Sequence, residues 1–196
     1  MGTRFVVVQH AEKEAAPGDP GLSPLGVMQA EAVAARLVQI EIAAVYSSPM
    51  CRARQTGAQI AGRVGLSVTV EDRLTERMNW AGDQPLEAFL LEWARSTAER
   101  DFQPRSGKSS RAAGVRLERA LCELARRHPD QTVVVIGHGG VTIDLARNLV
   151  RDEAVEILAP GVIHGGIPSC SITEIVADSG GLRVVALADS DWVQNR

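Results

Sequence analysis

The stretch TVVVIGHGG, residues 132–140, decides the fold. Its first five residues, Thr132 to Ile136, form a continuous apolar and β-branched run, which is typical of a strand buried on both faces of a parallel sheet. Gly137 ends this run, and residues 141–149 have the spacing of a helix. A strand that passes through a glycine-rich turn into a helix is the repeating unit of an α/β fold.

The rest of the chain repeats this order. Apolar runs predict strands at residues 5–8, 43–46 and 67–70, and two β-rich runs end the chain at 170–176 and 183–188. Ser23 followed by Pro24 predicts the start of one helix, and Ser48 followed by Pro49 the start of another that ends at Gly65. Further helices are predicted over 85–99 and 110–127, with a loop or hinge at 102–110. We therefore expect one α/β domain, residues 1–196, with three α/β/α layers around a mostly parallel sheet.

Composition limits the classes of function. Apolar residues make up 45% of the 196 residues, enough for one core, and the aromatic share of 4% means that this core is aliphatic. The net charge of −3, without a basic run, disfavours a nucleic-acid binder. A small anionic substrate remains compatible with this charge, because a few arginines can form a local positive pocket.

Cysteine content and hydropathy indicate where the protein works. Three cysteines without C-x-x-C spacing disfavour a disulfide scaffold and a zinc site. No apolar run approaches the roughly 18 residues that a membrane helix needs, and the N-terminal residues lack the apolar core of a secretory signal. We expect a cytoplasmic protein that does not contact a membrane. The sequence gives no indication of its oligomeric state.

Residues with chemical functions follow the predicted parallel strands. Ligands of open α/β sheets bind at the carboxyl ends of the strands. His10 follows the first strand, Arg52 the second, Glu76 the third and His138 the fourth. We therefore expect two histidines, an arginine and a carboxylate at one edge of the sheet.

Each of these residues also has a structural interpretation when it is taken alone. His10 is either a strand-end residue bonded to backbone, or a nucleophile, general base or metal ligand. His138 is less ambiguous, since glycines on both sides, Gly139 among them, permit a ligand to approach the backbone. Arg52 is either a surface residue or a clamp for a phosphate at a helix N-terminus. For Glu76, only its place after the third strand supports a function.

Three rival chemistries lack their sequence patterns. Two histidines and a carboxylate could bind zinc, but no H-x-x-x-H or H-x-x-E spacing is present. A serine hydrolase would show a G-x-S-x-G elbow, and a P-loop would show G-x-x-x-x-G-K-[ST]. We expect neither a metal nor any other cofactor.

Five segments resemble the histidine phosphatase superfamily, the phosphoglycerate-mutase-like proteins. SSPMCRARQT (47–56) is close to the family's S-S-P-x-x-R-A-x-Q-T, and VVVIGHGG (133–140) to its second active-site histidine segment. VVVQHAE (6–12) stands where the family has a strand followed by R-H-G. LTE (74–76) and IPSCSITEI (167–175) match two less specific motifs. The resemblance spans residues 5–176 and implies the phosphoglycerate-mutase-like fold.

The resemblance also implies a mechanism. His10 would become a phosphohistidine, Arg52 and His138 would hold the phosphoryl oxygens, and Glu76 would protonate the leaving oxygen and then help to activate water. The family's R-H-G arginine is Gln9 here, an uncharged donor, and its glycine is Ala11. Gln9 and Gly139 are thus candidate phosphate contacts of a metal-independent phosphatase that we expect to be slow.

Three interpretations of function remain open on the sequence. A phosphatase acting on a small phosphorylated substrate is favoured over a phosphoglycerate-type mutase, because mutases of this family tend to be longer. A non-catalytic binder of a phosphorylated ligand or a protein is supported only by Gln9. Further candidate residues are Lys13, which could restore positive charge near His10, Ser23, the expected N-cap, and His164, a loop histidine whose nearness to the segment IPSCS could place it at the site rim.

Overall fold

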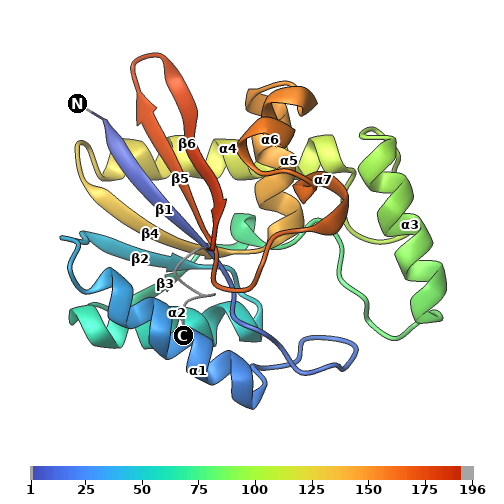
Figure 1. Ribbon diagram of the computed structural model, residues 1–196, viewed down its shortest axis with the longest axis horizontal. Coiled ribbons are helices and arrows are strands. Elements are labelled where there is room, and N and C mark those ends of the chain that lie inside the picture. Colours follow the sequence, from blue (N-terminus) through green and yellow to red (C-terminus); the bar gives the residue numbers. More distant parts are fainter. Residues whose placement is uncertain (1, 191–196) are drawn as a thin grey trace.

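A computed structural model describes residues 2–190 of the chain. The sheet in this part of the chain has the strand order β3-β2-β4-β1-β5-β6 (Figure 1). The four strands β1 (Thr3–Gln9), β2 (Ala44–Ser47), β3 (Val68–Val70) and β4 (Thr132–Gly137) are parallel to one another. The strand β5 (Ile172–Asp178) pairs antiparallel with β1, and β6 (Gly181–Asp189) pairs antiparallel with β5 at the edge of the sheet.

Helices cover both faces of the sheet and give the three expected layers (Figure 1). On one face lie α1 (Pro24–Leu37) and α2 (Cys51–Val64), and on the other lie α4 (Ser110–Arg127) and α5 (Gly139–Leu149). The helix α3 (Leu86–Ala98) stands beyond the sheet, next to the short helix α7 (Val162–Gly165). A 3₁₀ turn, η1 (Asp72–Leu74), follows β3, and α6 (Asp152–Leu158) follows α5.

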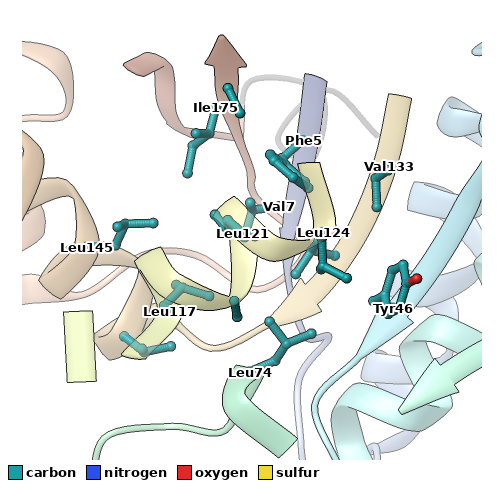
Figure 2. Close-up of a cluster of buried hydrophobic side chains, with 14 of the residues drawn as sticks. Phe5, Val7, Tyr46, Leu74, Leu117, Leu121, Leu124, Val133, Leu145 and Ile175 are labelled. Carbon is teal, nitrogen blue, oxygen red and sulfur yellow. The ribbon is translucent and has the colours of Figure 1, made fainter. Parts of the chain in front are cut away.

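Alternation along β1 explains why its apolar run is continuous. Phe5 and Val7 pack into the cluster formed with α4, which Figure 2 shows around Leu121. Val6 and Val8 point to the other face and pack with residues of α1 and α2 such as Ile60. Successive side chains of a strand face opposite sides, so a strand between two helical layers needs apolar residues at every position.

The predicted elements are confirmed with three differences. The helix expected to begin at Ser48 and Pro49 begins at Cys51, because Ser48 bonds His138 and the carboxylate of Asp19, rather than a serine, accepts from the N–H of Cys51. The helices α6 and α7 were not predicted from the sequence, since they are too short for a clear apolar period. No helix within residues 2–190 combines the length and hydrophobicity that crossing a membrane requires.

Candidate active site

Strand register brings the expected residues together. Gln9 at the end of β1 pairs with Gly137 at the end of β4, and Ser47 at the end of β2 pairs with Ile136. Since β4 lies between β1 and β2, the residues that follow the three strands meet at one edge of the sheet. His10, His138 and the first turn of α2, with Arg52, therefore form one cluster, as the sequence predicts.

His10 is held as a neutral imidazole with one nitrogen facing the cluster. Its Nδ1 lies 2.7 Å from the Ala11 carbonyl oxygen, and its Nε2 accepts a hydrogen bond from Arg52 Nε at 3.0 Å. A carbonyl only accepts, so Nδ1 carries the proton and Nε2 keeps its lone pair. Burial and the charge of Arg52 lower the pKa of His10 to about 3. The nitrogen that faces Arg52 is thus unprotonated at neutral pH, as a nucleophile must be.

Arg52 joins the two histidines. The side chain is 4% exposed, and its Nη2 lies 3.4 Å from His138 Nδ1. Burial lowers its pKa, while the nearby charges of Glu76 and then Asp19 act in the opposite direction. Its Nη1 has no hydrogen-bond partner among residues 2–190, although Asp19 Oδ1 is 3.6 Å away. A buried guanidinium with an unused donor is suited to receive an anion.

His138 completes the cluster from the start of α5. A guanidinium only donates, so His138 Nδ1 accepts from Arg52 and Nε2 donates to Ser48 Oγ at 2.7 Å. Burial, followed by electrostatic interactions with His10 and Arg52, places the pKa of His138 well below its usual range. The His10 and His138 rings meet edge to face, with centroids 5.2 Å apart. Both rings are therefore neutral and oriented.

Glu76 approaches the cluster through the backbone of α5. Its Oε2 accepts from Gly140 N at 2.9 Å, and its Oε1 accepts from Val141 N at 2.8 Å and from Arg77 N at 2.7 Å. A Cβ at Gly140 would lie 2.7 Å from Glu76 Oε1, so glycine is needed there for the carboxylate to approach. The position after the third strand thus places Glu76 at the N-terminus of the helix that His138 begins.

Gln9 and Gly139 lie next to the nucleophile. Gln9 Nε2 is 3.4 Å from His10 Nε2, and Gln9 Oε1 is buried without a hydrogen bond within the described part of the chain. A Cβ at Gly139 would lie 3.6 Å from Gln9 Oε1 and 3.0 Å from Ile167 Cγ1. The amide of Gln9 thus lies beside the His10 nitrogen that faces Arg52.

The three remaining candidates differ in their placement. The charge of Lys13 contributes to the lowered pKa of His10, so it lies near the cluster, where its Nζ donates to the Glu14 carbonyl. Ser23 caps α1 by accepting from Gly26 N, and it donates to the Glu12 carboxylate. His164 is exposed on α7. Of the three, the structure brings Lys13 to the site.

Three residues that the sequence analysis did not assign also touch the site. Ser48 bonds His138, and Asp19 caps α2 by accepting from Cys51 N at 2.9 and 3.0 Å. Arg116, on α4, donates to the carbonyl oxygens of Thr75 and Glu76. The SSP motif was a signal for Ser48. No local pattern marks Arg116, which reaches the site across forty residues of sequence.

Known proteins show similarities consistent with this geometry. Residues 6–190 match the histidine phosphatase superfamily (branch 1). Phosphoserine phosphatase 1 of Hydrogenobacter thermophilus is 32% identical over 69% of this chain and 70% of its own length. Glucosyl-3-phosphoglycerate phosphatase of Mycobacterium tuberculosis is 28% identical over 76% of this chain and 75% of its own.

Two further similarities differ in extent. A bifunctional protein of Mycobacterium tuberculosis is 30% identical over 93% of this chain, which spans only 53% of that protein. The solved structure of mycobacterial glucosyl-3-phosphoglycerate phosphatase superimposes with a TM-score of 0.79, at 24% identity, covering 97% of this chain and 100% of the other. Its fold is the fold seen here. The match over residues 6–190 shows that the chain belongs to the histidine phosphatase superfamily.

Proposed function

We propose that this protein is a phosphatase that hydrolyses phosphomonoesters through a phosphohistidine on His10. The observation that carries the proposal is the 3.0 Å contact between Arg52 Nε and His10 Nε2. It puts the lone pair of a neutral, buried imidazole beside a cation that has a second donor unused. A phosphoryl group placed there would meet the nucleophile and its charge partner together.

In the first step, His10 Nε2 attacks phosphorus and the bond from phosphorus to the ester oxygen breaks. Glu76 in its acid form gives its proton to the leaving oxygen. The carboxylate that results accepts from the backbone N–H groups of Arg77, Gly140 and Val141, which stabilises the charge as it forms. In the second step, Glu76 takes a proton from water, the water oxygen attacks phosphorus, and the bond from phosphorus to His10 breaks.

Arg52, His138 and Gln9 would hold the phosphoryl oxygens. The unused Nη1 of Arg52 supplies one charged donor, and the Gln9 amide supplies a neutral one. Burial is the main cause of the lowered pKa of His138, and the nearby positive charge of Arg52 adds to it; the negative charge of a bound phosphoryl group would act in the opposite direction. His138 could then take up a proton at Nδ1 and donate it as a hydrogen bond to the phosphoryl group.

The substrate we propose is a small phosphorylated metabolite. The relatives named for phosphoserine and for glucosyl-3-phosphoglycerate support this class. The net charge of −3 gives no support for a nucleic-acid substrate. A cytoplasmic setting, without a metal or other cofactor and with one domain over residues 1–196, belongs to the same proposal. The uncharged Gln9 favours one alternative, a binder of phosphorylated ligands without turnover.

Release of inorganic phosphate tests the proposal. Phosphoserine, 3-phosphoglycerate, glycerol phosphate and 4-nitrophenyl phosphate would be offered without a bisphosphate primer, so that a mutase scores as inactive. We expect phosphate release by the wild type, none above background by His10→Ala, and full activity in His128→Gln. His128 ends α4 at the opposite edge of the sheet, where it bonds Tyr46. Equal rates for wild type and His10→Ala on all four esters would overturn the proposal.

A further inference from the structure

A buried ion pair lies behind the active site. Asp144 on α5 is 0% exposed, and its Oδ1 accepts from Arg77 Nη1 at 3.1 Å and from Ser110 Oγ at 2.5 Å. Burial raises the pKa of Asp144 to about 6 despite the opposing charge of Arg77. A buried pair of this kind is a poor source of stability, because desolvation of both charges offsets their attraction. Its presence therefore calls for a role other than stabilising the core.

Arg77 connects this pair to Glu76. The two residues are adjacent, and the Arg77 N–H donates to Glu76 Oε1 at 2.7 Å. The guanidinium of Arg77 is fastened to α5 at Asp144, while the Glu76 carboxylate is fastened to the same helix at the N–H groups of Gly140 and Val141. Both side chains of the dipeptide are thus anchored to the first turns of one helix.

Helix α3 also contacts Arg77. Arg77 Cζ lies 3.9 Å from the centroid of the Trp93 ring, and Arg77 Nη2 donates to Thr97 Oγ1 at 2.6 Å. The Trp93 ring in turn approaches Gly140, where a Cβ would lie 2.7 Å from ring atom Cη2. Figure 1 shows that α3 stands away from the sheet. Arg77 therefore connects α3 to the site through its contacts with Trp93 and Thr97. A shift of Arg77 would move Glu76 and Trp93 together.

We propose that Asp144 is a positioning residue, which acts through Arg77 to hold Glu76 within reach of the oxygen that leaves phosphorus. This inference rests on the proposed function, in which Glu76 is the general acid. Loss of the Asp144 charge removes the anchor of Arg77, and the Glu76 carboxyl then meets the leaving oxygen less often. The defect is confined to steps in which Glu76 transfers a proton.

The leaving group separates this role from general damage to the fold. An alkoxide needs a proton to leave phosphorus, whereas 4-nitrophenolate is stable enough to leave without one. Both esters form the same phosphohistidine, and kcat/KM reports only the steps up to its formation. A displaced general acid therefore lowers kcat/KM for an alkyl phosphate and not for 4-nitrophenyl phosphate. A site that is merely destabilised lowers both values.

The test compares Asp144→Asn with the wild type on 4-nitrophenyl phosphate and on the panel alkyl phosphate with the highest wild-type kcat/KM. Removing a general acid loses roughly 10²- to 10⁴-fold. We expect the kcat/KM of Asp144→Asn to fall at least about tenfold on the alkyl ester, which is less than complete removal of the general acid would cause, and less than about threefold on the aryl ester. The matched control is Glu174→Gln, which breaks the Arg4–Glu174 pair of 2.6 Å in the sheet and should leave both values unchanged.

A second variant and a double mutant keep the inference testable if Asp144→Asn folds poorly. Arg77→Lys keeps the charge but loses the fork that reaches both Asp144 and Thr97, and it should show the same selective loss. In a Glu76→Gln background, Asp144→Asn should cause no further loss on the alkyl ester, because the two residues act in one step.

The outcomes distinguish the two proposals. In one outcome, Glu76→Gln lowers kcat/KM only for the alkyl ester, whereas Asp144→Asn and Arg77→Lys lower kcat/KM equally for both esters. This outcome overturns the positioning role of Asp144 and leaves the proposed phosphatase function standing. Additive losses in the double mutant also overturn it. A wild type that is inactive on every ester overturns the proposed function, and the positioning role with it.

Discussion

Replacing Gln9 with arginine, the residue of the R-H-G motif that residues 9–11 resemble, should accelerate this enzyme. Gln9 Nε2 lies 3.4 Å from His10 Nε2, and Gln9 Oε1 is buried without a partner within residues 2–190. Gln9→Arg replaces this neutral amide with a guanidinium that can donate to two phosphoryl oxygens. Gln9 Nε2 and Arg52 Nε both lie against His10 Nε2, at 3.4 and 3.0 Å, so the new guanidinium would add a second cation beside the nucleophile.

The expected gain comes from the difference between two kinds of hydrogen bond. A neutral bond contributes about 1 kcal/mol net and a charge-assisted one about 1.5–3 kcal/mol. A difference of about 1.4 kcal/mol that is felt in the transition state raises kcat roughly tenfold. The new charge also lowers the pKa of His10 further, but that pKa is already about 3. The nucleophile stays neutral at pH 7, so protonation does not mask the gain.

The assay is steady-state phosphate release at a saturating alkyl phosphate at pH 7, with folding checked by circular dichroism. Gln9→Met is the matched control, because it has a similar length and donates no hydrogen bond. We expect Gln9→Arg to be about tenfold faster than wild type and Gln9→Met to be slower by a similar factor. If folded Gln9→Arg is no faster and Gln9→Met is as fast as wild type, Gln9 does not contact the phosphoryl group.

Three other changes have defined outcomes. Arg52→Lys keeps the charge but loses the planar guanidinium that contacts both histidines. The activation free energy should rise by about 1.5–3 kcal/mol, so kcat should fall roughly 10- to 100-fold in the phosphate-release assay. Gly140→Ala places a Cβ 2.7 Å from Glu76 Oε1, whereas nothing lies within 4 Å of a Cβ at Gly62. Activity should therefore fall at least about tenfold in the first variant only, and equal activities would refute this. The folded-state pKa of His10, about 3, lies below its unfolded value of 6.5, so the unfolded state binds more protons between these values. His10 should therefore contribute a fall in the free energy of unfolding of about 1.4 kcal/mol for each pH unit between 6.5 and about 3, and urea titrations should show a fall that is shallower by this amount in His10→Gln than in the wild type.

The layers and the cluster could be predicted from the sequence because both depend on local patterns. Apolar runs such as 5–8 and 132–136 mark strands, and parallel strands deliver the residues after them to one edge of the sheet. That rule alone placed His10 beside His138, which the paired ends Gln9 and Gly137 then confirmed. The types of the residues that follow the strands could be interpreted as a site, because the strand ends fix where these residues lie.

The residues that support the site from behind, such as Asp144 and Asp19, could not be predicted from the sequence. Asp144 occupies an ordinary position inside a predicted helix, and nothing in its neighbourhood distinguishes it from a surface carboxylate. Its burial against Arg77 and Ser110 results from the way α4 and α5 pack, which involves contacts between distant segments. Asp19 lies in an irregular loop, where its bonds to Cys51 N depend on the path of the whole loop.

The central claim is that His10 carries the phosphoryl group during turnover. The enzyme is mixed with an excess of an alkyl phosphate, the reaction is stopped rapidly without acid, and the peptides are analysed by mass spectrometry. This measures the phosphorylation of His10 directly. A phosphohistidine mechanism predicts one phosphoryl group on the peptide that contains His10, labile to acid and stable to base, and absent from His10→Ala. A wild-type enzyme that releases phosphate while no phosphorylated His10 forms at any time in the reaction would contradict it.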